Sequence, residues 1–132
     1  MEIERKENWE SILAAELLKS KTMPFQYGKN DCTIWASNML KTYSNLKWEH
    51  SWNNKREAIQ LHKSKPMVNQ VSDVLGAPIG NILATKRGDL VQKGTGLDSA
   101  LGICIGGKVA LLKPKIGICY ADLKDCTYSW RI

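Results

Sequence analysis

Residues 24–32 read Pro24-Phe25-Gln26-Tyr27-Gly28-Lys29-Asn30-Asp31-Cys32 and bring a cysteine to the start of a predicted helix. Apolar residues recur at helical spacing after Thr33, which predicts a helix over residues 31–43. Gly28 and Asn30 favour a turn and Asp31 is a suitable N-cap, so Cys32 falls in the first helical turn. A thiol there feels the partial positive charge of unpaired backbone N–H groups, which favours the thiolate. Cysteine peptidases prepare their nucleophile in this way.

The elements around this helix define the fold class. Residues 6–19 carry an apolar stripe, which predicts a preceding helix. Two further helices are expected at 54–63 and 67–75, after a loop at 44–54. Five short segments rich in β-forming residues follow, separated by glycine and proline turns: 89–92, 100–105, 109–112, 116–120 and 127–132. Helices first and an antiparallel sheet second make the fold α+β, and 132 residues fit a single domain, 1–132.

Charge and hydropathy limit the classes of binding partner that the sequence favours. The chain carries 19 Lys and Arg against 13 Asp and Glu, a net charge of +6. The basic residues are scattered from Arg5 to Arg131, so a nucleic-acid partner is not expected, although a basic module for nucleic acid or an acidic protein remains an alternative. No apolar run approaches the roughly 18 residues that span a bilayer, and the charged N-terminal segment does not resemble a signal peptide. We therefore expect no membrane insertion and synthesis in a cytoplasm.

The four cysteines show no metal-binding pattern. There is no C-x-x-C pair, and neither His50 nor His62 stands at a zinc-like spacing from a cysteine. We expect separate reduced thiols, no metal and no cofactor. Cys104 and Cys119 lie in predicted strands, where cysteine serves as a small apolar side chain, and Cys126 near a turn receives no role.

The order of motifs resembles the papain-like cysteine peptidases, and among them the NlpC-type enzymes of bacteria and phages that cut peptide stems of the cell wall. Residues 27–32 (Tyr-Gly-x-x-Asp-Cys) resemble a shortened form of their nucleophile motif. Residues 87–91 (Arg-Gly-Asp-Leu-Val) match the Gly-Asp-hydrophobic pair that opens their sheet. Residues 100–106 (Ala-Leu-Gly-Ile-Cys-Ile-Gly) match their strand His-Val-Gly-Ile-x-Ile-Gly. The resemblance implies helices packed on a small antiparallel sheet or half-barrel.

The same match places apolar residues at two catalytic positions. The family's histidine falls at Ala100, and its polar third residue falls at about Ala110 or Leu111. A cysteine attacks an amide usefully only if a thiolate forms and the leaving amine is protonated, and histidine does both. The resemblance therefore implies a vestigial site of Cys32, Ala100 and Ala110 in a protein that has lost hydrolysis.

An active enzyme is the alternative, and it needs an unorthodox base for Cys32. His50 and His62 could reach over from the segment between the helix and the sheet, although exposed polar positions are expected for both. Asp98 could serve only with a pKa well above its reference of about 4. Tyr27 could donate its hydroxyl at an oxyanion site, and a packing role explains it equally well.

A narrower resemblance covers residues 9–132. A phage- and prophage-borne family shows a first helix, Pro-Phe-x-Tyr-Gly-x-x-Asp-Cys, a helical middle, Arg-Gly-Asp, Leu-Gly-Ile-x-x-Gly-Gly and a terminal Trp-Arg-hydrophobic, all of which occur here in order. Its members are encoded beside phage tail genes, which implies a tail or tail-assembly protein that acts by binding. The expected partners are tail or tail-tip proteins, with cell-wall peptides as the alternative. The expected location is the host bacterial cytoplasm during assembly and then the virion tail.

Two tryptophans in the predicted loop favour a protein interface. Trp48 and Trp52 show no apolar period that would place them in a core. An exposed aromatic loop suits partner binding, because tryptophan is enriched at interface hot spots. Trp9, Trp35 and Trp130, in contrast, fall at positions expected to be buried.

Overall fold

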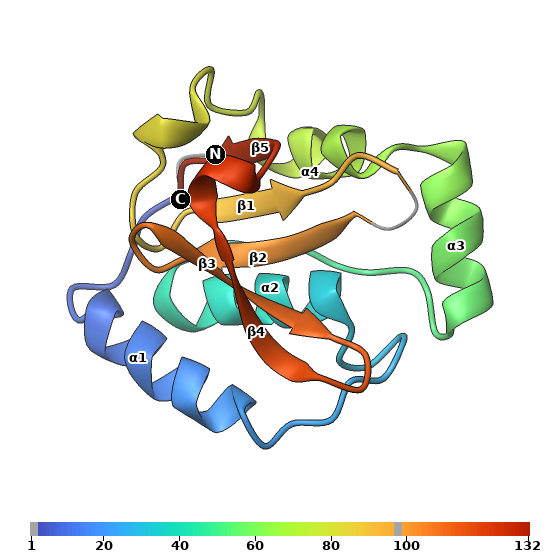
Figure 1. The fold of residues 1–132 in the computed structure, drawn as a ribbon, viewed down its shortest axis with the longest axis horizontal. Helices are drawn as coiled ribbons and strands as arrows, with labels where there is room; N and C mark the ends of the chain where they lie inside the picture. The colour runs from blue at the N-terminus through green and yellow to red at the C-terminus, as the bar shows by residue number, and fades with distance from the viewer. Residues whose placement is uncertain (1–2, 97–98) are drawn as a thin grey trace.

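A computed structural model describes residues 3–96 and 99–132 and shows helices packed on one sheet (Figure 1). The helices of the described chain are α1 (Trp9–Ser20), α2 (Cys32–Tyr43), α3 (Lys55–Ser64) and α4 (Met67–Leu75). The strands that follow are β1 (Leu90–Lys93), β2 (Ala100–Cys104), β3 (Lys108–Lys113), β4 (Gly117–Asp122) and β5 (Tyr128–Trp130). Short 3₁₀ turns are η1 (Ile82–Ala84) and η2 (Leu123–Asp125). The predicted α+β class is therefore confirmed.

The sheet is antiparallel, with strand order β4-β3-β2-β1-β5. β1 to β4 form a meander, and β5 returns to pair with the free side of β1. The turn from β2 to β3 is the two-glycine hairpin expected from the sequence, in which the Ile105 N–H donates to the Lys108 carbonyl. α2 packs against one face of the sheet, and α1 packs against α2 (Figure 1).

The main core lies between α2 and the sheet. Trp35 and Leu40 of α2 meet Leu101 and Ile103 of β2, and all four are nearly or fully buried. Trp130 of β5 is buried in the same core, so the expected burial of Trp35 and Trp130 is confirmed. The core thus holds the start of β2 directly against the helix that carries Cys32.

A smaller core covers the other face of the sheet under η2. Its buried members are Val91, Cys104, Val109, Leu111, Leu123 and Cys126. Cys104 is therefore a buried apolar strand residue, as predicted, whereas Cys119 in β4 is half-buried. Because side chains pack on both faces of β2, this packing fixes the position of β2 relative to the helices.

Close packing between β2 and β3 accounts for the glycine, Gly102, in the Leu-Gly-Ile stretch of β2. Gly102 pairs with Leu111 of β3. A Cβ atom at this position would lie 2.4 Å from the Ala110 carbonyl oxygen and 2.5 Å from Leu111 Cδ2. A side chain here would push β2 and β3 apart, so the strand requires glycine.

Asp89 precedes β1 and is fully buried. Its Oδ1 accepts hydrogen bonds from Arg5 Nη2 (2.9 Å) and the Ile132 N–H (3.1 Å). Its Oδ2 accepts from the Lys86 N–H (2.9 Å) and lies 3.4 Å from Arg131 Nε. Arg5 also donates from Nε to the Ile132 carbonyl (2.9 Å). This Asp89 cluster (Arg5, Asp89, Arg131 and Ile132) ties residues near both chain ends to the start of β1.

The segment between α2 and α3 contains no helix, as predicted, but its tryptophans are buried. The exposed fractions of Trp48 and Trp52 are 8% and 5%. Trp48 packs in the main core, and Trp52 packs with Ile34 of α2 and Ala58 of α3. The prediction of an exposed aromatic loop is therefore wrong, because the loop lays both indoles against the helices. Trp48 and Trp52 therefore do not form an exposed surface for a partner.

Candidate functional site

Asp31 caps α2, as the sequence predicts. Its Oδ1 accepts from the Ile34 N–H (3.0 Å), and its Oδ2 accepts from the Gly28 N–H (3.1 Å) and from Trp52 Nε1 (2.6 Å). The carboxylate is buried, with an exposed fraction of 3%. Three neutral donors therefore hold it in place and fix the position of Cys32 beside it.

Gly28 brings the turn before α2 against the loop that follows it. Its φ of +83° is a conformation that favours glycine. A Cβ atom at Gly28 would lie 2.3 Å from the carbonyl carbon of Asn53. The turn and the loop thus touch backbone to backbone, which closes one side of the site.

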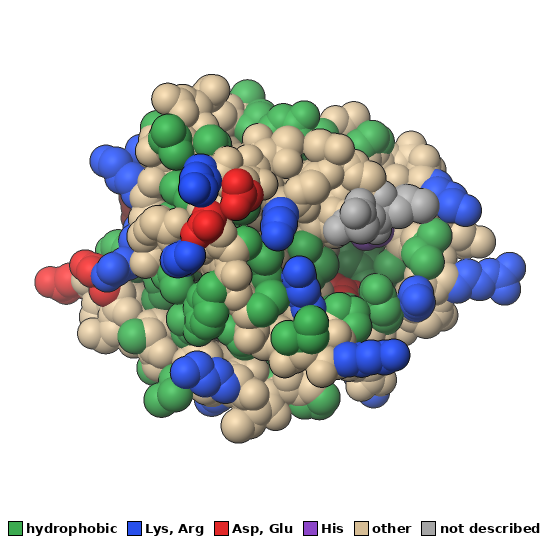
Figure 2. Space-filling model, viewed as in Figure 1, with side chains coloured by type: hydrophobic (Ala, Val, Ile, Leu, Met, Phe, Trp, Pro, Cys, Tyr) green, Lys and Arg blue, Asp and Glu red, His purple; other side chains and the backbone are tan. Residues whose placement is uncertain are grey.

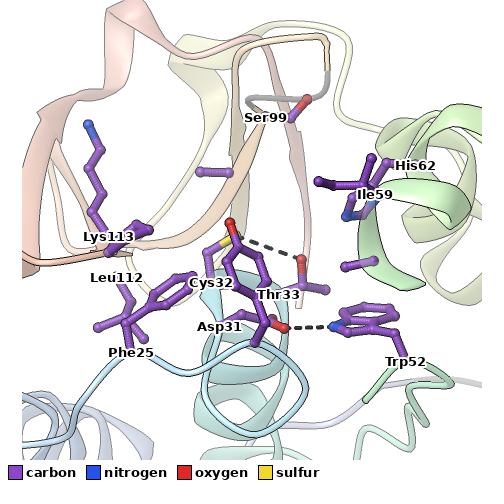
Figure 3. Close-up of a pocket in the computed structure, with 14 residues that line it drawn as sticks. Phe25, Asp31, Cys32, Thr33, Trp52, Ile59, His62, Ser99, Leu112 and Lys113 are labelled. Carbon is purple, nitrogen blue, oxygen red and sulfur yellow. Dashed lines mark hydrogen bonds between the residues drawn. The ribbon is translucent and has the colours of Figure 1, made fainter. Parts of the chain in front are cut away.

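The start of α2 opens into a pocket of about 280 Å³ (Figure 3). Among the residues singled out from the sequence, those that line it are Tyr27, Cys32, Trp52, His62 and Ala100. The other lining residues are Phe25, Asp31, Thr33, Ala58, Ile59, Ser99, Leu112, Lys113 and Pro114. The pocket therefore lies between α2, α3 and the adjoining ends of β2 and β3, and most of its lining is apolar.

Cys32 is half-buried, and its Sγ lies 3.8 Å from Thr33 Oγ1 (Figure 3). Burial raises the pKa of this thiol above its ordinary value. Hydrogen bonds from the Leu101 backbone and from Thr33 act in the opposite direction, and the charge of Asp31 raises the pKa further. The raised pKa is opposite to the effect of the helix start, because loss of solvent around the sulfur outweighs the hydrogen bonds that lower the pKa.

Tyr27 combines packing with a polar position. Its ring makes an edge contact with Phe25, with 4.9 Å between centroids. Burial raises the pKa of its hydroxyl, and the nearby Cys32 and Asp31 add to the shift. The phenol therefore remains a neutral hydrogen-bond donor beside the thiol.

The vestigial site predicted from the sequence is brought together only in part. Ala100, at the start of β2, lines the pocket with Cys32. Ala110 does not: it pairs with Ile103 and is fully buried in the main core. Continuing the register from the Gly102–Leu111 pair by two residues places Lys113 opposite Ala100. Lys113 lines the pocket, and finding it required the strand register rather than motif spacing.

His50 is held away from Cys32. Its Nε2 lies 2.7 Å from Ser37 Oγ. Its ring makes a tilted contact with Trp48 and an edge contact with Trp52, at centroid distances of 5.2 and 4.9 Å. Burial lowers the pKa of His50 to about 4, and the charge of Lys41 contributes. The ring is therefore neutral near pH 7 and half-buried, which corrects the exposed position expected from the sequence.

His62 is also half-buried instead of exposed, and it stands on the α3 wall of the pocket (Figure 3). The Gln70 side-chain nitrogen lies 2.9 Å from His62 Nδ1 and donates to the Lys65 carbonyl (2.7 Å). A carbonyl can only accept, so the Gln70 atom is the amide nitrogen and Nδ1 accepts from it. Neutral His62 therefore carries its proton on Nε2, and burial lowers its pKa.

The remaining candidate base, Asp98, lies outside the described residues. Within residues 3–96 and 99–132, no hydrogen bond joins Cys32 to either histidine. In the same residues, no group of three His, Cys, Asp or Glu side chains is placed to hold a metal ion. No helix of the described chain is long and apolar enough to cross a membrane.

The fold and pocket define an α+β protein with a cysteine at the start of a helix, facing the end of an antiparallel sheet. A family model described as "Domain of unknown function (DUF6950)" matches residues 4–132, and the chain belongs to that family. No curated protein matches the chain.

Proposed function

We propose that this chain is a phage or prophage tail or tail-assembly protein, built on an NlpC-type papain-like fold and acting by protein binding without hydrolysis. The observation that carries the loss of hydrolysis is the pocket itself. Cys32 and Ala100 line it together, which supports the proposal that they occupy the family's nucleophile and histidine positions. The scaffold supports this relationship, because α2 packs on β2 in the order that the motifs imply.

The chemistry of the pocket favours binding over catalysis. Burial raises the pKa of Cys32, so the thiol is neutral near pH 7. A neutral thiol is a poor nucleophile, and at Ala100 no side chain can take its proton or protonate a leaving amine. The apolar lining and the neutral hydroxyl of Tyr27 suit recognition of a side chain.

The tail assignment rests on the ordered motifs of residues 9–132, from Pro-Phe-x-Tyr-Gly-x-x-Asp-Cys to the terminal Trp-Arg-Ile. The partners proposed are tail or tail-tip proteins, met in the host bacterial cytoplasm during assembly and retained in the virion tail. The structure gives these motifs structural roles that suit a binding scaffold. Asp31 positions the helix, Gly102 allows the strand contact, and Asp89 joins the chain ends.

The test is binding of the purified chain to recombinant tail and tail-tip proteins encoded beside it, measured by biolayer interferometry. The wild type and Cys32→Ala should bind the same subunit with equal affinity. Absence of binding to every tail subunit, or loss of binding in Cys32→Ala alone, would overturn the proposal.

A second candidate function is a cysteine peptidase or amidase acting on cell-wall peptides. The observation that favours it is the presence of His62 in the same pocket as Cys32. Its Nδ1 already accepts from Gln70, and its proton is on Nε2, so it must turn or change tautomer to act as a base. Purified cell-wall peptides incubated with wild type, Cys32→Ala and His62→Ala separate the two functions. Cleavage that disappears in both variants would establish the enzyme.

A further inference from the structure

The face of α3 that points to solvent carries cations without acidic partners. Lys55, Arg56 and Lys63 are exposed, and none forms an ion pair with a described residue. Exposed Lys21 and Lys47 of the described chain also form no ion pair, so what distinguishes the three α3 cations is that they lie together on one helix beside the pocket. The positive charge of α3 is therefore available to an outside partner.

These cations line a shallow groove that continues into the pocket. The α3 groove is lined by Lys55, Arg56, Ile59, Gln60 and Lys63 and has a volume of about 490 Å³. Ile59 lines both the groove and the pocket, and so connects them. Lys55 Nζ lies 5.8 Å from the centroid of the Tyr27 ring, at the pocket's edge.

The pocket lining includes a lysine, Lys113. Figure 2 shows a hollow on the right of the molecule whose visible walls are mainly hydrophobic, with Lys and Arg side chains around it. Lys113 stands at this rim, and its amine points away from Cys32 (Figure 3). The inner end of the pocket holds the carboxylate of Asp31, which already accepts three hydrogen bonds from neutral donors. An anionic group is therefore favoured at the rim and an apolar group inside.

We infer that the α3 groove and the pocket together bind an acidic peptide segment of a partner protein, which places one apolar side chain in the pocket and its carboxylates on Lys55, Arg56 and Lys63. The pocket volume of about 280 Å³ is close to the lower limit of small-molecule sites, roughly 300 Å³, and suits a single side chain. The inference rests on the proposed binding function and names the chemistry of the partner.

The experiment uses a short fluorescein-labelled peptide with one Leu flanked by Glu and Asp, and measures its anisotropy with the full chain. The triple variant Lys55→Glu, Arg56→Glu, Lys63→Glu should bind at least about tenfold more weakly, because three favourable charge contacts become repulsive. The matched control is Lys21→Glu, Lys47→Glu, Lys124→Glu, which changes net charge equally at exposed lysines outside the groove and should bind like wild type. Replacing the peptide's Leu by Ser should also weaken binding, since the pocket loses its apolar occupant.

Three results would overturn the inference. One is no binding of the peptide to wild type at low salt. Another is an equal loss in the two triple variants, which would mean a general charge effect. The third is equally tight binding of a single-stranded oligonucleotide or of anionic lipid vesicles, which would mean a surface for any polyanion.

The same variants separate this inference from the proposed function. If the α3 triple variant still binds a tail subunit as wild type does, the tail function stands and the groove is not its binding site. If the peptide binds as expected but no tail subunit does, the groove inference stands and the tail assignment fails. Circular dichroism of both triple variants should match wild type, since all the substituted side chains are exposed.

Discussion

Asp31 and Asp89 are both buried carboxylates at the start of an element, one before α2 and the other before β1. Asp89 contacts two arginines and two backbone N–H groups, so its charge is balanced by opposite charge. Asp31 is held by neutral donors alone, two from the backbone and one from Trp52. The Asp89 cluster joins residues near both ends of the chain to each other, whereas Asp31 lines the pocket.

The difference shows that a buried Asp at the start of an element can have two different structural roles. Asp31-Cys32 and Gly88-Asp89 each place a carboxylate before an element, but of the two only Asp31-Cys32 lines the pocket. At Asp89 the donors come from residues near both ends of the chain, and no room remains for a ligand. At Asp31 the donors come from the turn before α2, from α2 and from Trp52, and Asp31 still lines the pocket with Cys32. The substitutions below test this contrast.

Asp89→Ala should have the largest effect on stability. It leaves Arg5 partly buried without its carboxylate and removes acceptors from the Lys86 and Ile132 N–H groups. Breaking a buried ion pair in this way costs about 3–5 kcal/mol. Urea denaturation measures the loss. Asp122→Ala, which removes an exposed pair with Lys108, is the control and should cost far less, because solvent screens exposed pairs. Equal losses in the two variants would contradict the structural role of the Asp89 cluster.

Asp31→Asn should cost less, about 2 kcal/mol by the same measurement. The amide keeps one oxygen for the cap at Ile34 but turns an NH₂ group toward the Gly28 and Trp52 donors. Trp52→Phe removes one of those donors, so the double variant should lose less than the sum of the single losses. Additive losses would show that Trp52 and Asp31 act independently.

His50 should make stability depend on pH. Its pKa is about 4 in the folded chain and about 6.5 in the unfolded chain. Between these values the unfolded state binds more protons, so stability present above about pH 6.5 is lost as the pH falls toward 4. His50→Gln should show a smaller loss than wild type at pH 5 relative to pH 7.5. The two pKa values alone give about 2 kcal/mol, and solvent screening of the half-buried ring reduces the expected difference to about 1 kcal/mol. Parallel pH profiles of wild type and variant would exclude His50 as the cause.

Cys32 should give the smallest stability change and a clear chemical signature. Cys32→Ala removes only a half-buried thiol and should alter stability by less than about 1 kcal/mol. Alkylation followed by mass spectrometry should show a midpoint for Cys32 above that of an ordinary thiol, because burial raises its pKa. A midpoint below the ordinary value, lost on denaturation, would instead indicate a prepared nucleophile and favour the peptidase.

Local patterns in the sequence locate the elements well. The helix predicted at 67–75 coincides with α4, and α3 begins directly after Asn54, whose side chain accepts from the Glu57 N–H. Helical spacing, capping and turn residues are properties of a few neighbouring residues, so a single sequence contains them. The strands lie within about two residues of the predicted segments for the same reason.

The errors concern contacts between distant residues. Trp48 and Trp52 have no local period, yet both pack against helices. Ala110 pairs with Ile103 and so lies away from Ala100, which follows from the β2–β3 register. The pKa of Cys32 depends on how much solvent the folded chain removes from it, which motif spacing does not specify. From the sequence, the pocket could be predicted only as a place where Cys32 lies near the start of the second strand.

The Asp89 cluster also has a mechanical consequence. Arg5 and Ile132 bond to each other and to one carboxylate, and Arg5 also forms a backbone bridge with Ser44 at the end of α2, so tension applied at the two ends loads all these contacts. β5 has three residues and lies at the edge of the sheet beside them. Under load, the bonds of Arg5 and Ile132 to Asp89 and the pairing of β5 with β1 would therefore be strained together.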